Sequence, residues 1–419
     1  MASSGFVTQS TNLTIQHEME KKLMGLMADK NFNLNEIEAL ISQGVNINCT
    51  NREGLTPLLQ LVKLGQARND LLDVIRLLLD QNGIDVNCKD SDEWNALYYL
   101  CRLYQKADLI DIILLLIQRG IKVDWTNKSR QNAFLFLCQH YPHKNMIDIV
   151  QIFIDNNIDI GCTNSNGWNA LHHLCRNYKQ SNLVDVFRLL VEHGMDITCN
   201  TRVGWNALHI LCHEKTQDNH MDLIKLFINL GIDVNSKNKG GWNALHILCQ
   251  NYQKDNLIDI VRLFINHGVD VNCSDDDERN VLHILCGRYT EENLVDLVQL
   301  LIDHGIDVNS KNRGGWNALH FLCRNYKKGN LIDIVRLFIN NGIDVKCIND
   351  GGWNVLHILC KNCSNLSNLI EIVELLVENG IDVDCKTQHG KGLNAFKIFC
   401  NDNANAKVYN KLKLLLEKK

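Results

Sequence analysis

The segment Gly-Trp-Asn-Ala-Leu-His-Ile-Leu-Cys at residues 241–249 recurs along most of the chain. Its asparagine, Asn243, returns every 37 residues, and degenerate copies extend the series to Thr56 and Asn394, with spacings of 39 and 40 at the two ends. A period of about 20–50 residues is typical of solenoids, whose units stack side by side. The other members of the series are Asn95, Asn132, Asn169, Asn206, Asn280, Asn317 and Asn354.

The copy that begins at residue 315 predicts a helix, a loop, a second helix and a hairpin. Asn317 is a good N-cap, and the apolar residues that follow it have helical spacing. The second helix, over residues 331–339, is apolar almost all round, which indicates a helix packed between layers. We expect Asn330 to cap this helix, with Asp333 completing an arrangement like a capping box.

Gly342 fits the left-handed residue that ends the second helix. One unit leaves apolar residues uncovered on both faces, so its neighbours must stack against it. We therefore predict a mostly α fold, a solenoid of stacked helix pairs with β-hairpin or turn connections. Residues 1–16 are expected to form a disordered tail, and residues 17–419 a single solenoid of about eleven units, with boundaries at 17–53, 54–92, 93–129, 130–166, 167–203, 204–240, 241–277, 278–314, 315–351, 352–390 and 391–419.

These motifs resemble the ankyrin repeat family, whose consensus has Gly-x-Thr-Pro-Leu-His before the first helix and Gly-Ala-Asp-Val-Asn after the second. Here the motifs stand at residues 241–246 and, as Gly-Ile-Asp-Val-Asn, at residues 231–235. Asn-Ala replaces Thr-Pro in nearly every copy, and the period is 37 residues in place of 33. The four additional residues fall between the paired helices, where we expect a recurring tyrosine to pack against the inserted turn: Tyr104, Tyr141, Tyr178, Tyr252, Tyr289 and Tyr326.

Histidine and cysteine recur together as His-x-x-Cys in six copies, from His172/Cys175 to His357/Cys360. Both residue types bind zinc, and three residues on a helix place them on one face. The resemblance implies instead that the histidine bonds to the backbone of the neighbouring hairpin. Most of the 17 cysteines recur once per repeat, which favours structural thiols over disulfides. Only Cys363 falls outside the two recurring series.

The residue before the capping asparagine is tryptophan in six copies, Trp94, Trp168, Trp205, Trp242, Trp316 and Trp353. The resemblance places it on the concave, hairpin-facing surface, where ankyrin proteins contact their partners. Tryptophan is enriched among the residues that anchor interfaces. The alternative is that each indole packs on the adjacent hairpin and stiffens the stack.

One copy breaks the pattern at its hairpin tip. Asp275-Asp276-Asp277 lies between two basic tips, and Arg279 replaces the tryptophan. Structural needs repeat with the period whereas partner contacts need not, so we predict that this interruption is the centre of recognition. The predicted partner-binding residues are Trp168, Trp205, Lys239, Trp242, Asp276, Asp277, Arg279, Arg313, Trp316 and Trp353.

The resemblance therefore predicts a non-catalytic scaffold or adaptor that binds a protein partner through its concave hairpin and first-helix surface. The alternative is a metal-binding or enzymatic role for the His-x-x-Cys pairs. The net charge of -5 gives no long-range attraction to nucleic acid or anionic lipid. No stretch approaches 18 uninterrupted apolar residues. We expect a monomer, cytoplasmic or nuclear, without a cofactor.

Overall fold

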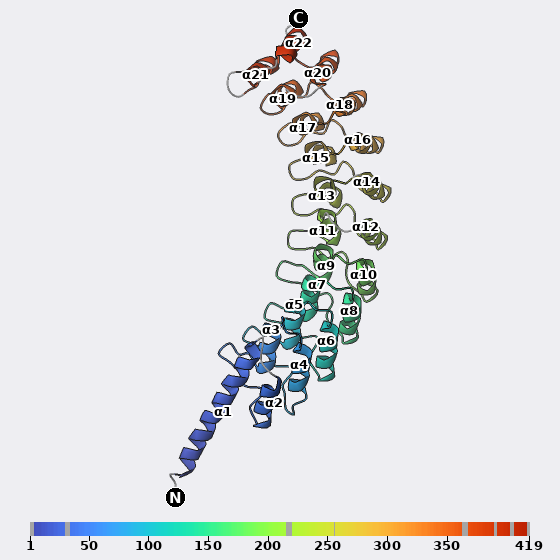
Figure 1. Cartoon of the computed structure of the whole chain (residues 1–419). Coiled ribbons are helices and arrows are strands. Elements are labelled where there is room, and N and C mark those ends of the chain that lie inside the picture. The colour runs from blue at the N-terminus through green and yellow to red at the C-terminus, as the bar shows by residue number, and fades with distance from the viewer. Residues whose placement is uncertain are drawn as a thin grey trace. The chain divides into compact units, whose positions relative to one another are not determined.

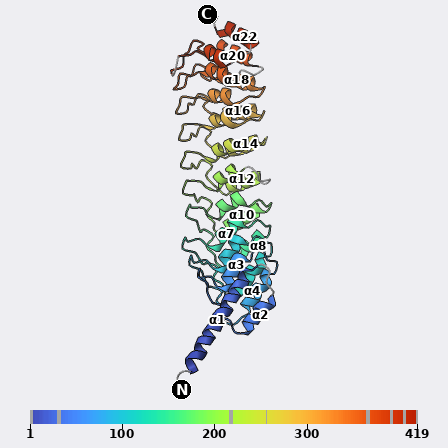
Figure 2. The same ribbon diagram turned by 60° about the vertical axis from the view of Figure 1, so that its left-hand side comes forward.

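The computed structural model describes residues 4–29, 34–214, 220–254, 256–362, 368–388, 392–402 and 406–416. These residues form 22 helices and one isolated antiparallel bridge, between Thr126 and Asn132. The chain divides after Arg202 into two compact units, here unit 1 (up to residue 202) and unit 2 (from residue 203). Within each unit, paired helices stack along two rows (Figures 1 and 2), which confirms the predicted fold class.

In unit 1, successive odd-numbered helices contact one another and form the first row. This row comprises α1 (Ser4–Ala28), α3 (Pro57–Leu64), α5 (Ala96–Leu103), α7 (Ala133–His140) and α9 (Ala170–Asn177). The second row comprises α2 (Leu34–Ser42), α4 (Leu71–Leu79), α6 (Leu109–Gln118), α8 (Met146–Asp155) and α10 (Leu183–Glu192).

Unit 2 repeats this plan, and its odd-numbered helices again contact their neighbours in the row. The first row comprises α11 (Ala207–His213), α13 (Ala244–Asn251), α15 (Val281–Arg288), α17 (Ala318–Asn325), α19 (Val355–Asn362) and α21 (Ala395–Asp402). The second row comprises α12 (His220–Asn229), α14 (Leu257–Asn266), α16 (Leu294–Asp303), α18 (Leu331–Asn340), α20 (Leu369–Glu378) and α22 (Ala406–Leu416).

The recurring asparagine caps the first-row helices from α5 to α21, as predicted. The Oδ1 atom of Asn317 accepts a hydrogen bond from the backbone N–H of His320 at 3.2 Å, which satisfies one of the unpaired donors at the start of α17. Thr56 does the same for Leu59 at 3.3 Å. The equivalent caps are Asn95, Asn132, Asn169, Asn206, Asn243, Asn280, Asn354 and Asn394.

The capping box predicted at the start of α18 is wrong, because Asn330 makes no side-chain cap. Its Oδ1 atom accepts from the hydroxyl of Tyr326 at 2.8 Å, and its Nδ2 atom donates to the carbonyl of Glu292 in the preceding repeat, also at 2.8 Å. The asparagine therefore ties the inserted turn to its neighbour. Packing of the tyrosines against this turn is confirmed by the same pairing at Tyr104/Asp108, Tyr141/Asn145, Tyr178/Asn182, Tyr252/Asn256 and Tyr289/Asn293.

Gly342 ends the pairing of α18 as predicted. Its φ of +78° lies in the left-handed region that L side chains rarely adopt. The next residue, Ile343, donates its N–H to the carbonyl of Phe338 at 3.0 Å and buries its side chain. This is the Schellman arrangement, in which a glycine lets the chain turn back while an apolar residue closes the helix end.

The second-row helices bury one wide face. In α18, Leu331, Ile334 and Phe338 are fully buried, whereas Asp333 and Arg336 are exposed. This apolar face packs against the neighbouring helices of the stack and contributes to the core. Within the described ranges, none of the helices combines the length and the apolar character needed to cross a membrane.

The amino-terminal segment differs from the prediction of a disordered tail over residues 1–16. Helix α1 begins at Ser4 and contacts α3, so it takes the place of a first-row helix. Leu23 and Met27 near its end are fully buried, and no proline interrupts the sequence before them. Because its carboxyl end is anchored in the core, the helix extends further toward the amino terminus than its polar sequence suggests. The predicted unit boundaries and the single continuous solenoid stay predictions.

Candidate binding surface

Each tryptophan of the recurring series stands at the end of a tip loop, the loop that leads from a second-row helix to the next first-row helix. In the loop before α17, Oδ1 of Asn312 accepts the backbone N–H of Gly314 at 3.1 Å and of Trp316 at 2.9 Å. The indole lies beside His320, with 5.7 Å between ring centroids, and is only partly buried. The loop and the helix thus fix the ring while leaving part of it exposed.

A basic or imidazole group lies beside the ring of every tryptophan in the series. The guanidinium of Arg324 lies 5.3 Å from the centroid of Trp316, and the ammonium of Lys361 lies 5.0 Å from that of Trp353. Such contacts are cation–π interactions, favoured by the negative face of the indole. The other pairs are Arg102/Trp94, Arg176/Trp168, His213/Trp205 and Arg279/Trp242.

The sequence reading missed these cations, although a signal was present. In four copies the cation follows its tryptophan by eight residues, which brings it back over the loop from the first-row helix. Trp242 is the exception, because Gln250 occupies that position. There the cation comes from the next repeat, where Arg279 lies 5.6 Å from the ring of Trp242.

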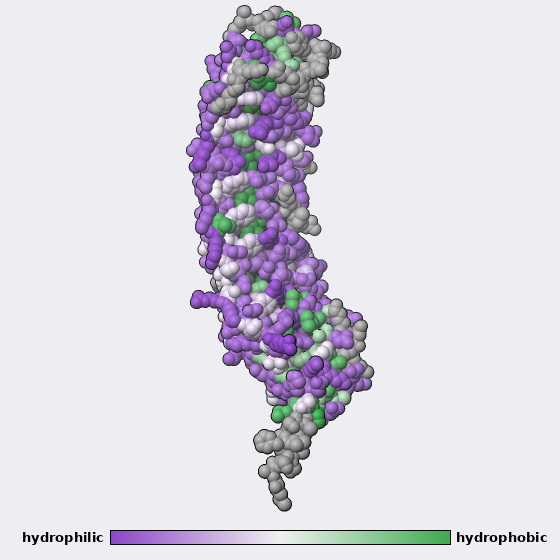
Figure 3. Space-filling model, turned by 90° about the vertical axis from the view of Figure 1, so that its left-hand side faces the viewer, coloured by the Kyte–Doolittle hydropathy of each residue, from purple (hydrophilic) through white to green (hydrophobic). Residues whose placement is uncertain are grey.

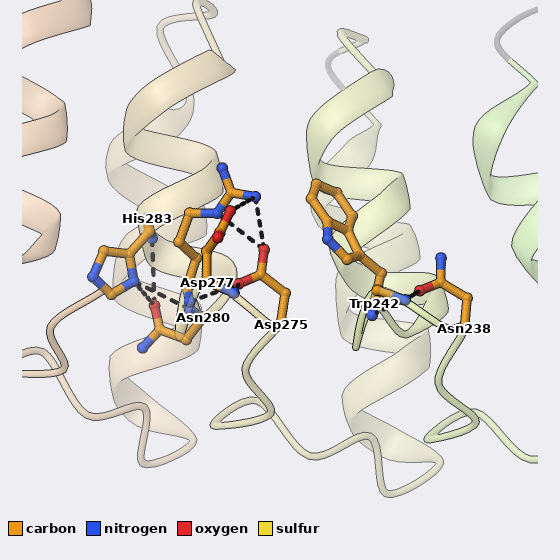
Figure 4. Close-up of polar contacts among 8 residues, drawn as sticks. Asn238, Trp242, Asp275, Asp277, Asn280 and His283 are labelled. Carbon is orange, nitrogen blue, oxygen red and sulfur yellow. Dashed lines mark hydrogen bonds and ion pairs between the residues drawn. The ribbon is translucent and has the colours of Figure 1, made fainter. Parts of the chain in front are cut away.

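The interruption at Asp275-Asp276-Asp277 has a structural component. The side chain of Asp275 is almost fully buried and occupies the position of Asn312 in its own loop, accepting the N–H of Asp277 at 2.9 Å and of Arg279 at 2.8 Å. Arg279 balances its charge through an ion pair of 2.8 Å, and reaches Asp277 at 3.1 Å (Figure 4). Two of the unusual residues thus compensate each other, whereas the side chain of Asp276 is exposed.

The tip loops are joined through their backbones. Lys239 donates its N–H to the carbonyl of Val203 at 3.0 Å, and Arg313 donates to that of Asp277 at 2.9 Å. Their side chains extend into solvent. Each tip therefore combines a fixed backbone with a side chain available for contact.

Pockets lie between successive tryptophans of unit 2. One of about 380 Å³ is lined by Trp205, Trp242 and Lys239, and another of about 330 Å³ by Trp316 and Trp353 with their two cations. Figure 3 shows small hydrophobic patches within a mostly hydrophilic face. In unit 1, Trp168 and Arg176 border a separate pocket of about 500 Å³.

The histidines of the His-x-x-Cys pairs use their rings for structure. Nδ1 of His209 accepts the backbone N–H of Asn206 at 3.2 Å, and Nε2–H donates to the carbonyl of Trp242 in the next tip loop at 3.2 Å. His283, His320 and His357 reach the next loop in the same way, which confirms the predicted role. Burial lowers the pKa of His320 to about 4, so the ring is neutral at physiological pH.

The partner cysteines are buried in the first-row helices, and desolvation raises the pKa of Cys249 and Cys286, and of Cys101 at the equivalent position of a copy that has Tyr98 in place of the histidine, well above the usual value. Such thiols are poor nucleophiles and poor metal ligands. In the described part of the chain, no group of three His, Cys, Asp or Glu side chains is placed to hold a metal ion. Cys363 lies outside the described residues.

Stacked pairs of helices, joined by tip loops and repeated every 37 residues, define a helical repeat protein. The family model for ankyrin repeats (3 copies) matches residues 24–127, 134–238, 212–312 and 286–388. The chain therefore belongs to the ankyrin repeat family, whose members typically act as protein-protein interaction modules and are usually non-catalytic. The comparison with curated proteins finds no match.

Proposed function

We propose that this protein is a non-catalytic scaffold that binds a protein partner through the tryptophan-bearing face of its repeats. The observation that carries the proposal is the repetition of a half-exposed indole with a basic or imidazole group beside it. Tryptophan and arginine are the residues most enriched at the energetic centres of protein interfaces. Here six such pairs are already formed in the unbound chain.

The rigidity of these pairs favours binding. Each indole packs on an aromatic side chain of its own helix, Tyr98 for Trp94 and a histidine in the other five copies, so contact with a partner freezes few additional rotamers. The entropic cost of association falls accordingly. The pockets beside Trp242 and Trp353 give a partner's apolar side chains a place to be buried.

The proposed contact residues remain the ten of the sequence analysis, now in two classes. Trp168, Trp205, Trp242, Trp316 and Trp353 would supply buried contact area, and Lys239, Asp276, Asp277, Arg279 and Arg313 would supply charges at the tips. Because Arg279 also balances buried Asp275, its substitution would disturb the loop as well as the contact. A test of the surface should therefore leave Arg279 unchanged.

Site-specific photo-crosslinking tests the proposal in cells that express the protein. Benzoylphenylalanine would replace Asn325, exposed near the tryptophans, or Asp276 at a tip, and in a control variant Arg336, exposed on the second-row helix α18. We expect at least one discrete crosslinked protein from Asn325 or Asp276, absent or at least about tenfold weaker from Arg336. Crosslinks of equal yield from all three positions would show that this face is not the binding surface.

A further inference from the structure

Five of the six first-row helices of unit 2 share one charge distribution. Helices α11, α13, α15, α17 and α19 contain no aspartate or glutamate, in a chain whose net charge is -5. Their charged residues are Arg288, Arg324 and Lys361, one at the carboxyl end of each of three successive helices. The surface of these three helices has no carboxylate and carries three cations, so it attracts anions.

The charges of these three residues are not neutralised within the described structure. All three side chains are exposed, and none forms an ion pair with a carboxylate among the described residues. Arg279, by contrast, is already paired with Asp275 and Asp277. Placement at a helix carboxyl end stabilises a cation but leaves its full charge available to a ligand.

Two adjacent pockets bring these cations together with aromatic rings. One, of about 300 Å³, is lined by Arg288, Phe321 and Arg324. The other, of about 330 Å³, is lined by Arg324 and Lys361 with Trp316 and Trp353. Arg324 lines both, so the two pockets are neighbours, and together they offer positive charge and aromatic surface in alternation.

The dimensions of this site suit an extended chain. Packed helices lie about 8–10 Å apart, and an extended segment advances about 3.3 Å per residue. Carboxylates about three residues apart would therefore reach the cations of successive helices. Apolar residues between them would meet Phe321, Trp316 and Trp353.

We propose that the site formed by α15, α17 and α19 binds an extended acidic segment of a partner protein, with carboxylates paired to Arg288, Arg324 and Lys361. This inference rests on the proposed function and specifies its ligand. The exposed carboxylates of Asp276, Asp277 and Asp350 at the nearby tips repel any anion, but a peptide can place neutral residues opposite them, whereas a nucleic acid carries a phosphate at every nucleotide; this favours a peptide over a nucleic acid.

Peptide selection provides the first test. The purified full chain would be used to select from a displayed library of random 12-residue peptides at low salt. We expect enrichment of Asp and Glu with apolar residues between them, at a spacing of about three. Failure to enrich any sequence, or enrichment of sequences no more acidic than the starting library, would overturn the proposal.

Charge variants then locate the bound peptide. Fluorescence anisotropy would measure the affinity of the most enriched peptide, labelled with fluorescein, for three proteins. The first is the wild type, and the second is the triple variant Arg288→Gln, Arg324→Gln, Lys361→Gln. The third is a control triple variant, Lys225→Gln, Arg262→Gln, Arg336→Gln. The control removes three exposed charges from one repeating position of the second-row helices. We expect the first triple variant to bind at least about tenfold more weakly and the control to match the wild type.

If both triple variants bind the peptide equally more weakly than the wild type, the effect comes from the net charge of the protein and the proposed site is refuted. Tighter binding of a labelled 20-base-pair DNA duplex than of the peptide would also refute it. The crosslink from Asn325 separates the two proposals. If this crosslink persists in the first triple variant, the face binds a partner and only the acidic segment is wrong.

Discussion

Arg279 stands where the flanking repeats have tryptophan, and its guanidinium neutralises a carboxylate that its own loop buries. In the loop before α17, the neutral Asn312 accepts the equivalent backbone hydrogen bonds, so no charge is buried and Trp316 can take the place of the arginine. Asp275 with Arg279 and Asn312 with Trp316 are therefore two self-consistent pairs. Substituting one member of a pair should cost more than exchanging both.

We expect Arg279→Ala to lower the free energy of unfolding by about 2 kcal/mol, less than for a fully buried pair because Arg279 is 30% exposed. The double variant Asp275→Asn, Arg279→Trp should lie within about 1 kcal/mol of the wild type. Urea titrations followed by circular dichroism measure both. Arg313→Ala at an exposed tip serves as the control, and a loss there equal to that of Arg279→Ala would contradict the buried-charge argument.

At the scale of single residues, the sequence predicts roles that depend on a fixed place in the repeat. The caps at Asn243 and its equivalents follow from residue type and period alone. The contact of Arg324 with Trp316 is not predicted, because it depends on how the last turn of the eight-residue helix α17 is placed relative to the loop that precedes the helix. In the sequence, Asp275 and Arg279 only interrupt the pattern, since charge compensation across a turn leaves no periodic signal.

At the scale of the helices, the sequence predicts cores better than ends. The stacked pairs and the glycine stop at Gly342 follow from apolar spacing and backbone conformation. The cap at Asn330 was predicted wrongly because the sequence contains a suitable residue whose side chain a tyrosine of the same repeat uses instead. Helix α1 starts earlier than predicted because its anchor, at Leu23 and Met27, lies near its far end.

The first-row helices carry their own reporters of unfolding. Burial raises the pKa of Cys101, Cys249 and Cys286, which are fully buried, and also that of Cys88 and Cys199, which are partly exposed. At pH 8 we expect iodoacetamide to modify the buried set at least about 100-fold more slowly, because both the thiolate and access to it require the helix to open. Peptide mass spectrometry over a time course measures each site.

Guanidinium at a concentration that unfolds the chain should abolish the difference in labelling between the two sets of cysteines. Rates for Cys249 equal to those of Cys199 in the native protein would show that the helices open freely. The order in which the buried cysteines become labelled in moderate denaturant would rank the local stability of the repeats.

At the scale of the molecule, the repeat predicts that units stack, because each layer needs a neighbour on both faces. It does not predict the division after Arg202, since the sequence keeps its 37-residue period through that point. Most repeats also contain a buried histidine. Desolvation lowers the pKa of His173 to about 3 and of His246, His283 and His320 to about 4.

These depressed pKa values make stability depend on pH in a defined direction. In the unfolded chain a histidine binds a proton below about pH 6.5, whereas the folded chain keeps these rings neutral down to about pH 4. Stability is therefore complete above pH 6.5 and is lost as the pH falls from 6.5 toward 4. At pH 5 the loss is about 2 kcal/mol for each such histidine.

We expect the urea midpoint to be constant from pH 8 to pH 7 and to fall steeply between pH 6.5 and pH 5, above the range in which most carboxylates titrate. His320→Gln should reduce that slope, whereas His267→Gln, at an exposed position on the carboxyl side of α14, should leave it unchanged. Because His173 lies in unit 1 and His246, His283 and His320 lie in unit 2, acid should weaken unit 2 more. A flat profile down to pH 5 would mean that the buried rings accept protons in the folded state.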